Sequence, residues 1–90
     1  MYLHLGQDTV VLQKEIIGIF DIEKASLSKY TRDFLKLAEK KGRVVNVSYE
    51  MPKSFVLCVC DGNPTVYISQ ISPQTLKKRA EQPLTDDRLF

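Results

Sequence analysis

The run SFVLCVC, residues 54–60, constrains the fold more than any other part of the chain. Side chains of a strand alternate between its two faces, and this run carries apolar side chains on both. The turn sequence DGNP (61–64) follows, and TVYISQ (65–70) has the composition of a strand that pairs back. We therefore expect a hairpin whose first strand lies in the interior of a sheet.

A second group of strands is expected at the start of the chain. The alternating stretch 2–5 meets Gly6, and the stretches 9–13 and 15–20 follow without a strong breaker. This order predicts a hairpin whose second arm is either long or bent near Lys14 and Gly18. A glycine inside a strand indicates a bulge or a close approach of another group to the backbone.

The best helix signal covers residues 28–42. Ser28 can accept hydrogen bonds from the first-turn amides, and Gly42 suits the left-handed stop at the other end. Apolar residues recur at helical spacing, which predicts one apolar face. This face consists of Tyr30, Phe34, Leu37 and Ala38.

The rest of the domain is predicted to add a strand over 43–50 and a short final helix over 72–80. Ser72 would cap that helix, and Pro73 would take its first position, where a missing N–H costs nothing. The fold class is then α+β: one domain over residues 1–81, with a mainly antiparallel sheet, one long helix and a short C-terminal helix. Residues 82–90 are expected to form a flexible tail. A chain of 90 residues builds only a thin core, so self-association is a common way to bury more surface.

The sequence contains few groups for catalysis or metal binding. His4 is the single histidine and reads as a strand residue, while Cys58 and Cys60 read as buried apolar packing. Two thiols without a matching second pair do not make a structural zinc site. No phosphate loop or catalytic triad can be assembled. We expect no enzyme activity, no cofactor, no metal and no small-molecule substrate.

Targeting signals are also missing from the pattern. No apolar run approaches the roughly 20 residues that a membrane span needs. The start of the chain lacks the basic lead and apolar stretch of a signal peptide. These features predict a cytoplasmic protein without membrane contact.

Positive charge gathers in the middle and late part of the chain. The net charge is +2, but residues 41–80 carry six Lys/Arg against Glu50 and Asp61, and residues 81–90 are acidic. Lys53 projects from the loop 50–54, and loops on a rigid sheet often carry function. The cations of LKKR (76–79) have a second explanation, because cations in the last turn stabilise the helix dipole. The basic stripe on the long helix reads as a solvated face.

Three stretches in order resemble the extracellular matrix regulatory protein B family of Gram-positive bacteria. They are MYLHLGQDTVVLQKEIIGIFDIEKAS, SYEMPKSFVL and VYISQISPQTLKKR, and the resemblance covers roughly residues 1–80. It implies a small cytoplasmic α+β protein linked to transcription. The related A branch is implied to consist of DNA-binding activators of biofilm matrix genes that form closed rings and contact DNA through basic residues.

One departure from the A branch bears on the site. That branch carries arginine at the positions of Glu15 and of Met51–Pro52, so these contacts do not transfer. Lys14 and Lys53 lie beside those positions. A lysine is a point charge without the planar fork of arginine, so it grips phosphate with less directionality.

Two interpretations follow. In the first, the protein is a homo-oligomeric regulator that contacts the DNA phosphate backbone. The predicted nucleic-acid-binding residues are Lys14, Arg43, Lys53, Lys77, Lys78 and Arg79. In the second, it is an oligomeric protein-interaction scaffold that associates through sheet edges and does not bind DNA itself. A third class, a small enzyme, would need a pocket with perturbed titratable groups, and the sequence offers none.

Overall fold

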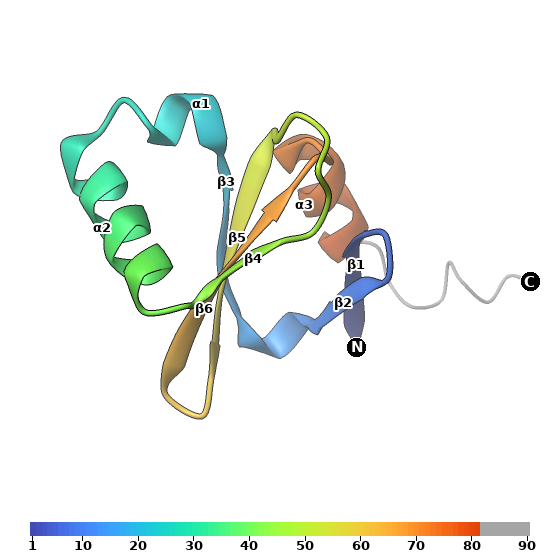
Figure 1. Cartoon of the computed structure of the whole chain (residues 1–90). Helices are drawn as coiled ribbons and strands as arrows, with labels where there is room; N and C mark the ends of the chain where they lie inside the picture. Colours follow the sequence, from blue (N-terminus) through green and yellow to red (C-terminus); the bar gives the residue numbers. More distant parts are fainter. Residues whose placement is uncertain (82–90) are drawn as a thin grey trace, which may run out of the picture.

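The structure is a computed structural model that describes residues 1–81 (Figure 1). It is an α+β fold, as predicted. The elements in chain order are β1 (Tyr2–Gly6), β2 (Thr9–Leu12), the 3₁₀ turn η1 (Gln13–Glu15), β3 (Ile16–Asp21), α1 (Ile22–Ala25), α2 (Lys29–Lys40), β4 (Val44–Asn46), β5 (Ser54–Cys60), β6 (Asn63–Ser69) and α3 (Pro73–Glu81). The predicted tail, 82–90, lies outside the described residues. No helix within 1–81 is long and apolar enough to span a membrane.

The main sheet has four strands in the order β3-β5-β6-β4. β5 lies inside it with β3 and β6 antiparallel on either side, so the predicted interior strand is confirmed. β4 pairs parallel to β6 at one edge, and β3 forms the other edge. β1 and β2 pair with each other as a separate two-stranded sheet. The turn after β5 uses positive φ at Asp61 and Gly62, which suits a tight hairpin.

Of the two forms predicted for the second arm, long or bent near Lys14 and Gly18, the structure shows the bent one. The η1 turn separates β2 from β3, and the β3–β5 register shifts between Ile16 and Gly18. A Cβ atom on Gly18 would lie 2.5 Å from the ring of Phe20. Glycine is therefore needed here because an aromatic ring occupies the space over its Cα.

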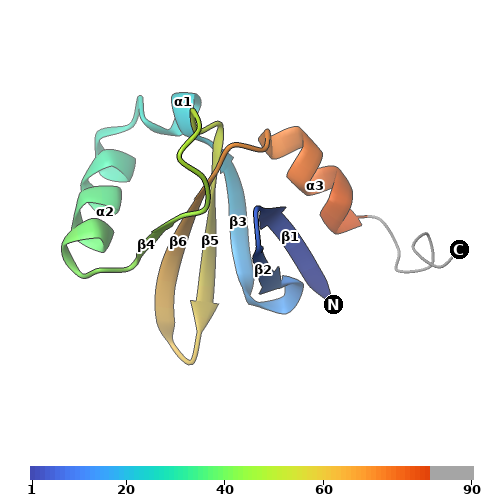
Figure 2. The ribbon, with the colours of Figure 1, turned by 45° about the vertical axis from the view of Figure 1, so that its right-hand side comes forward.

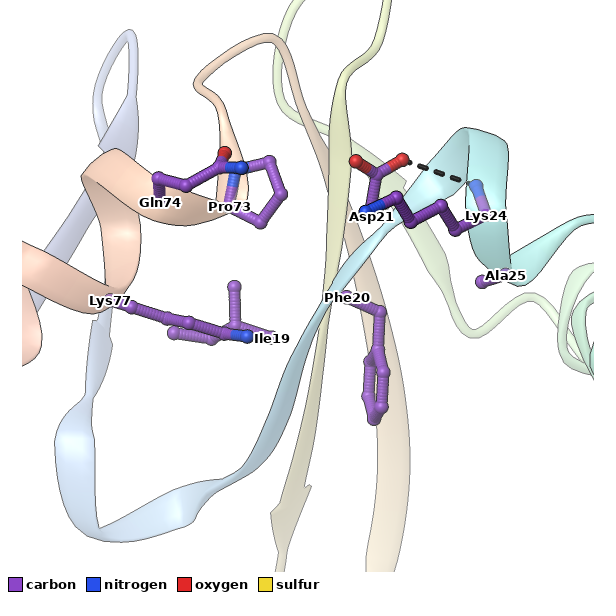
Figure 3. Close-up of a pocket in the computed structure, with 8 residues that line it drawn as sticks. All are labelled: Ile19, Phe20, Asp21, Lys24, Ala25, Pro73, Gln74 and Lys77. Carbon is purple, nitrogen blue, oxygen red and sulfur yellow. Dashed lines mark hydrogen bonds between the residues drawn. The ribbon is translucent and has the colours of Figure 1, made fainter.

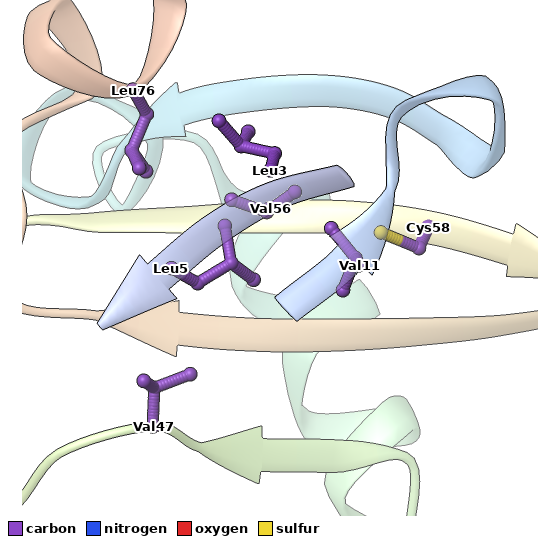
Figure 4. Packing of buried hydrophobic residues seen from close by; sticks show 7 residues of the cluster. All are labelled: Leu3, Leu5, Val11, Val47, Val56, Cys58 and Leu76. Atoms are coloured by element: carbon purple, nitrogen blue, oxygen red, sulfur yellow. The ribbon is translucent and has the colours of Figure 1, made fainter. Parts of the chain in front are cut away.

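One face of the main sheet is covered by the β1–β2 hairpin and α3 (Figures 1, 2 and 4). The buried side chains of this cluster are Leu3, Leu5, Val11, Val47, Val56, Cys58 and Leu76. The Oγ of Ser69 donates to the carbonyl oxygen of Leu5 at 2.7 Å and so ties the hairpin to the end of β6. The Oγ of Ser72 accepts from the amide of Thr75, which confirms the predicted cap of the final helix.

The opposite face of the sheet carries α1 and α2 (Figure 2). The caps of α2 are as predicted, because Ser28 accepts from the amide of Thr31 and Gly42 adopts a left-handed φ of 70°. The predicted apolar face of α2 is only partly buried. Ala38 is buried against Phe55 and Val66, whereas much of the remaining face lies in solvent.

The predicted bounds of two strands were wrong. The strand predicted over 43–50 is ordered as β4 only over Val44–Asn46, because β6 ends at Ser69 and offers no longer partner. Residues 48–50 turn away, and the Oγ of Ser48 accepts from the amide of Glu50 at 3.1 Å. β6 begins at Asn63, two residues earlier than predicted.

Candidate nucleic-acid interface

The sheet separates the predicted basic residues into two groups. Lys14 lies in η1 before β3, and Arg43 lies before β4, where its Nη2 donates to Oδ1 of Asn63 at 3.4 Å. Both are at the end of the sheet that carries the β5–β6 turn, but on opposite edges. Lys53 lies at the other end, beyond the length of β3, which is about 20 Å. The structure therefore does not bring these three residues together within one chain.

Main-chain hydrogen bonds fix the position of Lys53. Its amide donates to the carbonyl of Ser69 at 2.9 Å, and its carbonyl accepts from the amide of Ile22 at 3.1 Å. Lys53 thus joins the end of β6 to the start of α1. Its side chain is exposed and extends from a backbone held on both sides.

The three consecutive cations of α3 point in different directions. Successive helical residues are about 100° apart, and Leu76 occupies the buried side. Lys77 faces β3, while Arg79 points to the other side, where its Nη1 lies 3.4 Å from the carbonyl of His4. Lys78 lies between them and is exposed. Of the three, only Lys77 is among the residues that line the space beside β3.

An open groove of about 420 Å³ crosses the outer edge of β3 between α1 and α3 (Figure 3). Ile19 lines it on the α3 side of β3 and Phe20 on the α1 side. Figure 3 shows the Lys77 side chain entering from α3 and the Lys24 side chain entering from α1. We call Lys24, Lys53 and Lys77 the three-lysine end.

Lys24 was not predicted as a site residue because the sequence pattern did not indicate the short helix α1. The carboxylate of Asp21 accepts from the amides of Glu23 at 2.9 Å and Lys24 at 3.2 Å, and so caps the single turn α1. An Asp followed by three residues able to form a turn is a usable signal for such a cap. It fixes the main chain of Lys24 at the mouth of the groove.

None of the lysines of the three-lysine end forms a salt bridge in the described part of the chain. Within residues 1–81, one salt bridge occurs, between Lys29 and Asp33 at 3.1 Å on the exposed side of α2. Arg32 is also used locally, because its Nη1 donates to the carbonyl of Ser26 at 2.7 Å. The start of α3 adds the partial positive charge of a helix N-terminus beside Lys77. Asp21, Glu23 and Glu50 are acids near these lysines, and none of them forms a salt bridge with them among the residues that the structure describes, so the ammonium groups remain available to an anion.

The thiols show no metal-binding arrangement. No cluster of three or more His, Cys, Asp or Glu side chains suited to a metal occurs in the described part of the chain. Both cysteines are free, and Cys58 is buried as predicted. The prediction that Cys60 is also buried was wrong, because it lies on the exposed end of β5. Burial, with the charge of Glu15, raises the pKa of Cys58 to about 11.

Comparison with known proteins identifies the family. The family described as Extracellular matrix regulatory protein A-like matches residues 2–80, which is nearly every residue of the described domain. The chain belongs to this family. It is also 44% identical over 81 residues to Extracellular matrix regulatory protein B of Bacillus subtilis (strain 168), with 90% of this chain and 91% of that protein covered.

Membership of the Extracellular matrix regulatory protein A-like family confirms the resemblance seen in the sequence. The matched residues include every member of the three-lysine end. The names of the family and of the relative describe regulators. The structural features to be explained are thus those of a regulatory protein.

Proposed function

We propose that the protein is a homo-oligomeric, cytoplasmic regulator of matrix genes that binds the phosphate backbone of DNA through the three-lysine end. Family membership supports the regulatory role. The observation that carries the DNA contact is the groove in Figure 3, which Lys24 lines from α1 and Lys77 lines from α3. Lys53 extends the positive surface from the neighbouring loop.

The chemistry of this end favours phosphate over base recognition. Lysine ammonium groups are flexible point charges, whereas specific base contacts rely on bidentate arginine, asparagine or glutamine side chains. Gln74, on the rim of the groove, is one such side chain, beside two ammonium groups. Phosphate contacts position a protein on a duplex without reading its sequence. We therefore expect weak, salt-sensitive binding by each subunit.

Self-association would make such a weak site effective. Several identical sites on one duplex act together through their effective concentration. The domain also exposes large apolar side chains that a monomer of this size has no evident reason to keep in water. They include Tyr30, Leu37 and Met51, which are 88%, 51% and 80% exposed.

A gel-shift assay with duplex DNA at low salt tests the proposal. The Lys53→Ala/Lys77→Ala double variant removes two charges from the three-lysine end. The Lys14→Ala/Arg43→Ala double variant removes the same charge from the other end of the sheet. We expect the first to weaken binding at least tenfold and the second to do so by much less.

The outcomes separate the possibilities. Loss of binding only in the Lys14/Arg43 variant would move the contact to the other end of the sheet. Absence of any shift by the unsubstituted protein at low salt would refute DNA binding altogether. Light-scattering mass measurement on the same samples reports whether each variant keeps its subunit number.

The scaffold interpretation keeps a specific observation in its favour. The exposed apolar residues of α2 offer a protein-binding surface, on the opposite face of the sheet from α3 (Figure 2). A protein that forms oligomers in solution but retains no DNA at any salt concentration would fit this second candidate function.

A further inference from the structure

The exposed side of α2 carries an apolar strip that the rest of the described chain leaves open. Tyr30, Phe34 and Leu37 are 88%, 37% and 51% exposed. They lie at i, i+4 and i+7, so they form one continuous row on the helix. Leu27, just before the helix, is also exposed and extends the row.

Two hollows flank this strip and share Phe34 as a wall. The first, of about 260 Å³, has Phe20, Phe55 and Leu57 in its lining. The second, of about 220 Å³, lies between the end of α2 and the start of β6 and has Pro64 and Val66 in its lining. An apolar cavity of about 150 Å³ can hold a benzene ring, so either hollow has room for an apolar side chain. We call the strip and its hollows the α2 groove.

The second hollow also has a positive rim. Lys41 and Arg43 line it, and Lys36 and Lys40 lie on the adjoining surface of α2. Two carboxylates, Glu39 and Asp33, line the same surface as Lys36 and Lys40, and Asp33 is paired with Lys29. The preferred occupant therefore combines apolar side chains with negative charge.

The chain itself contains a segment with this composition. Residues 82–90, QPLTDDRLF, lie outside the described structure and directly follow α3. Leu84, Leu89 and Phe90 are apolar, and the adjacent acids Asp86 and Asp87 lie between them. Two apolar parts separated by two carboxylates match two apolar hollows, of which the second has a positive rim, and Arg88 leaves the segment with a net charge of −1.

The position of α3 argues that this segment reaches a different copy of the chain. α3 packs on one face of the main sheet, and α2 covers the other (Figure 2). Nine residues span at most about 30 Å even when fully extended. To reach α2 of its own chain, the segment would have to pass around a sheet edge and then still lie along the groove.

We propose that residues 82–90 of one copy occupy the α2 groove of a second copy. The inference rests on the self-association stated in the proposed function and names the contact that produces it. Because the donor segment and the receiving groove are different surfaces, the contact is head-to-tail. Such contacts repeat from copy to copy, as a closed ring or an open filament.

Light scattering on the full chain tests the contact from both sides. We expect the Leu89→Asp/Phe90→Asp variant to lower the measured mass toward that of a monomer. Tyr30→Asp should also lower the measured mass, by changing the groove side of the contact. Because Tyr30 is largely exposed, this substitution should not unfold the domain. The matched control is Tyr49→Asp, since Tyr49 is fully exposed but absent from the groove lining, and it should keep the mass of the unsubstituted protein.

A charge swap tests the electrostatic part. Asp86→Lys/Asp87→Lys should weaken the assembly, and adding Lys40→Asp/Lys41→Asp should restore it. Circular dichroism on each variant confirms that the domain remains folded.

The results distinguish this inference from the proposed function. If the unsubstituted protein is oligomeric and neither the segment nor the Tyr30 variant changes its mass, the inference is overturned while self-association stands. If the unsubstituted protein is a monomer, both self-association and docking between copies are overturned. DNA binding is measured separately by gel shift, and loss of the assembly should weaken it because several linked sites bind one duplex more tightly than a single site.

Discussion

Ser69 and Leu5, 64 residues apart in sequence, are joined by a hydrogen bond of 2.7 Å between the serine Oγ and the leucine carbonyl oxygen. Both residues are fully buried. The same Oγ accepts from the amide of Ile71 at 3.0 Å. One hydroxyl therefore satisfies two main-chain groups where the hairpin, β6 and the approach to α3 meet.

Ser69→Ala should lower the free energy of unfolding by about 1–3 kcal/mol. The substitution leaves a buried carbonyl and a partly buried amide without their partner, and an unsatisfied buried group costs about this much. Urea unfolding monitored by circular dichroism measures the change. Ser48→Ala, which removes a hydroxyl from a surface turn, is the control and should stay within about 0.5 kcal/mol. Equal effects of the two substitutions would contradict the role assigned to Ser69.

Gly18→Ala should destabilise the protein by about 1–3 kcal/mol through overpacking. The added Cβ would meet the ring of Phe20, which stacks on Phe55 with 4.9 Å between ring centroids. The double-mutant cycle with Phe20→Ala isolates this contact. In the Phe20→Ala background, the alanine at 18 should cost much less. A cost that is the same in both backgrounds would place the strain in the backbone instead.

The two thiols should differ in reactivity. Cys60 is exposed and should react with a thiol reagent in the folded protein, whereas Cys58 should react only on unfolding. Hydrogen bonding to Glu15 and the charges of Glu15 and Asp61 raise the pKa of Cys60, so its thiolate fraction at pH 8 is below that of a free cysteine. Glu15→Gln should therefore speed its modification, as followed by absorbance. A slower reaction in that variant would contradict the assigned cause.

Alkaline pH should destabilise the fold through Cys58. Burial, and to a smaller extent Glu15, raises its pKa from 9.0 to about 11, so the unfolded chain loses this proton first as pH rises. The contribution is fully present below pH 9 and is lost between about pH 9 and pH 11. Urea midpoints across this range should fall less steeply for Cys58→Ala than for the unsubstituted protein. Parallel pH profiles would count against the assignment.

Lys77 and Lys78 offer a comparison within one helix. Lys77 lines the groove, whereas Lys78 is not among its lining residues, although each substitution to alanine removes one charge. We expect Lys77→Ala to reduce the slope of log affinity for DNA against log salt by about 0.9 for each phosphate that is no longer neutralised. Lys78→Ala should change that slope by less. Fluorescence anisotropy with labelled duplex DNA gives both values.

Sequence patterns predicted the helices and strands better than they predicted which faces of these elements are covered. The two-faced apolar run correctly predicted β5 as an interior strand, and the caps at Ser28 and Ser72 correctly predicted where two helices begin. The row of Tyr30, Phe34 and Leu37 was correctly seen as apolar. Helical periodicity shows that a face is apolar but does not say whether the same chain covers it.

The candidate site was harder to predict because it depends on the ends of strands. Lys14 and Lys53 were both predicted to contact DNA, yet β3 separates them by about 20 Å. Lys24 belongs to a single helical turn that has too few residues to show periodicity. The run at 77–79 looked like one patch in sequence, but helical geometry disperses it.

The bond between Ser69 and Leu5 also bears on the order in which the protein becomes folded during synthesis. The fully buried partners of the β1–β2 hairpin in its core cluster all come from the second half of the chain, and they include Val56 and Leu76. The hairpin is therefore synthesised before these partners. Leu3 and Leu5 stay exposed to water until almost the whole domain has left the ribosome. Such non-local topologies close slowly and expose apolar surface meanwhile. The β1–β2 hairpin is thus made before β5 and α3 and can complete its docking only after both have left the ribosome.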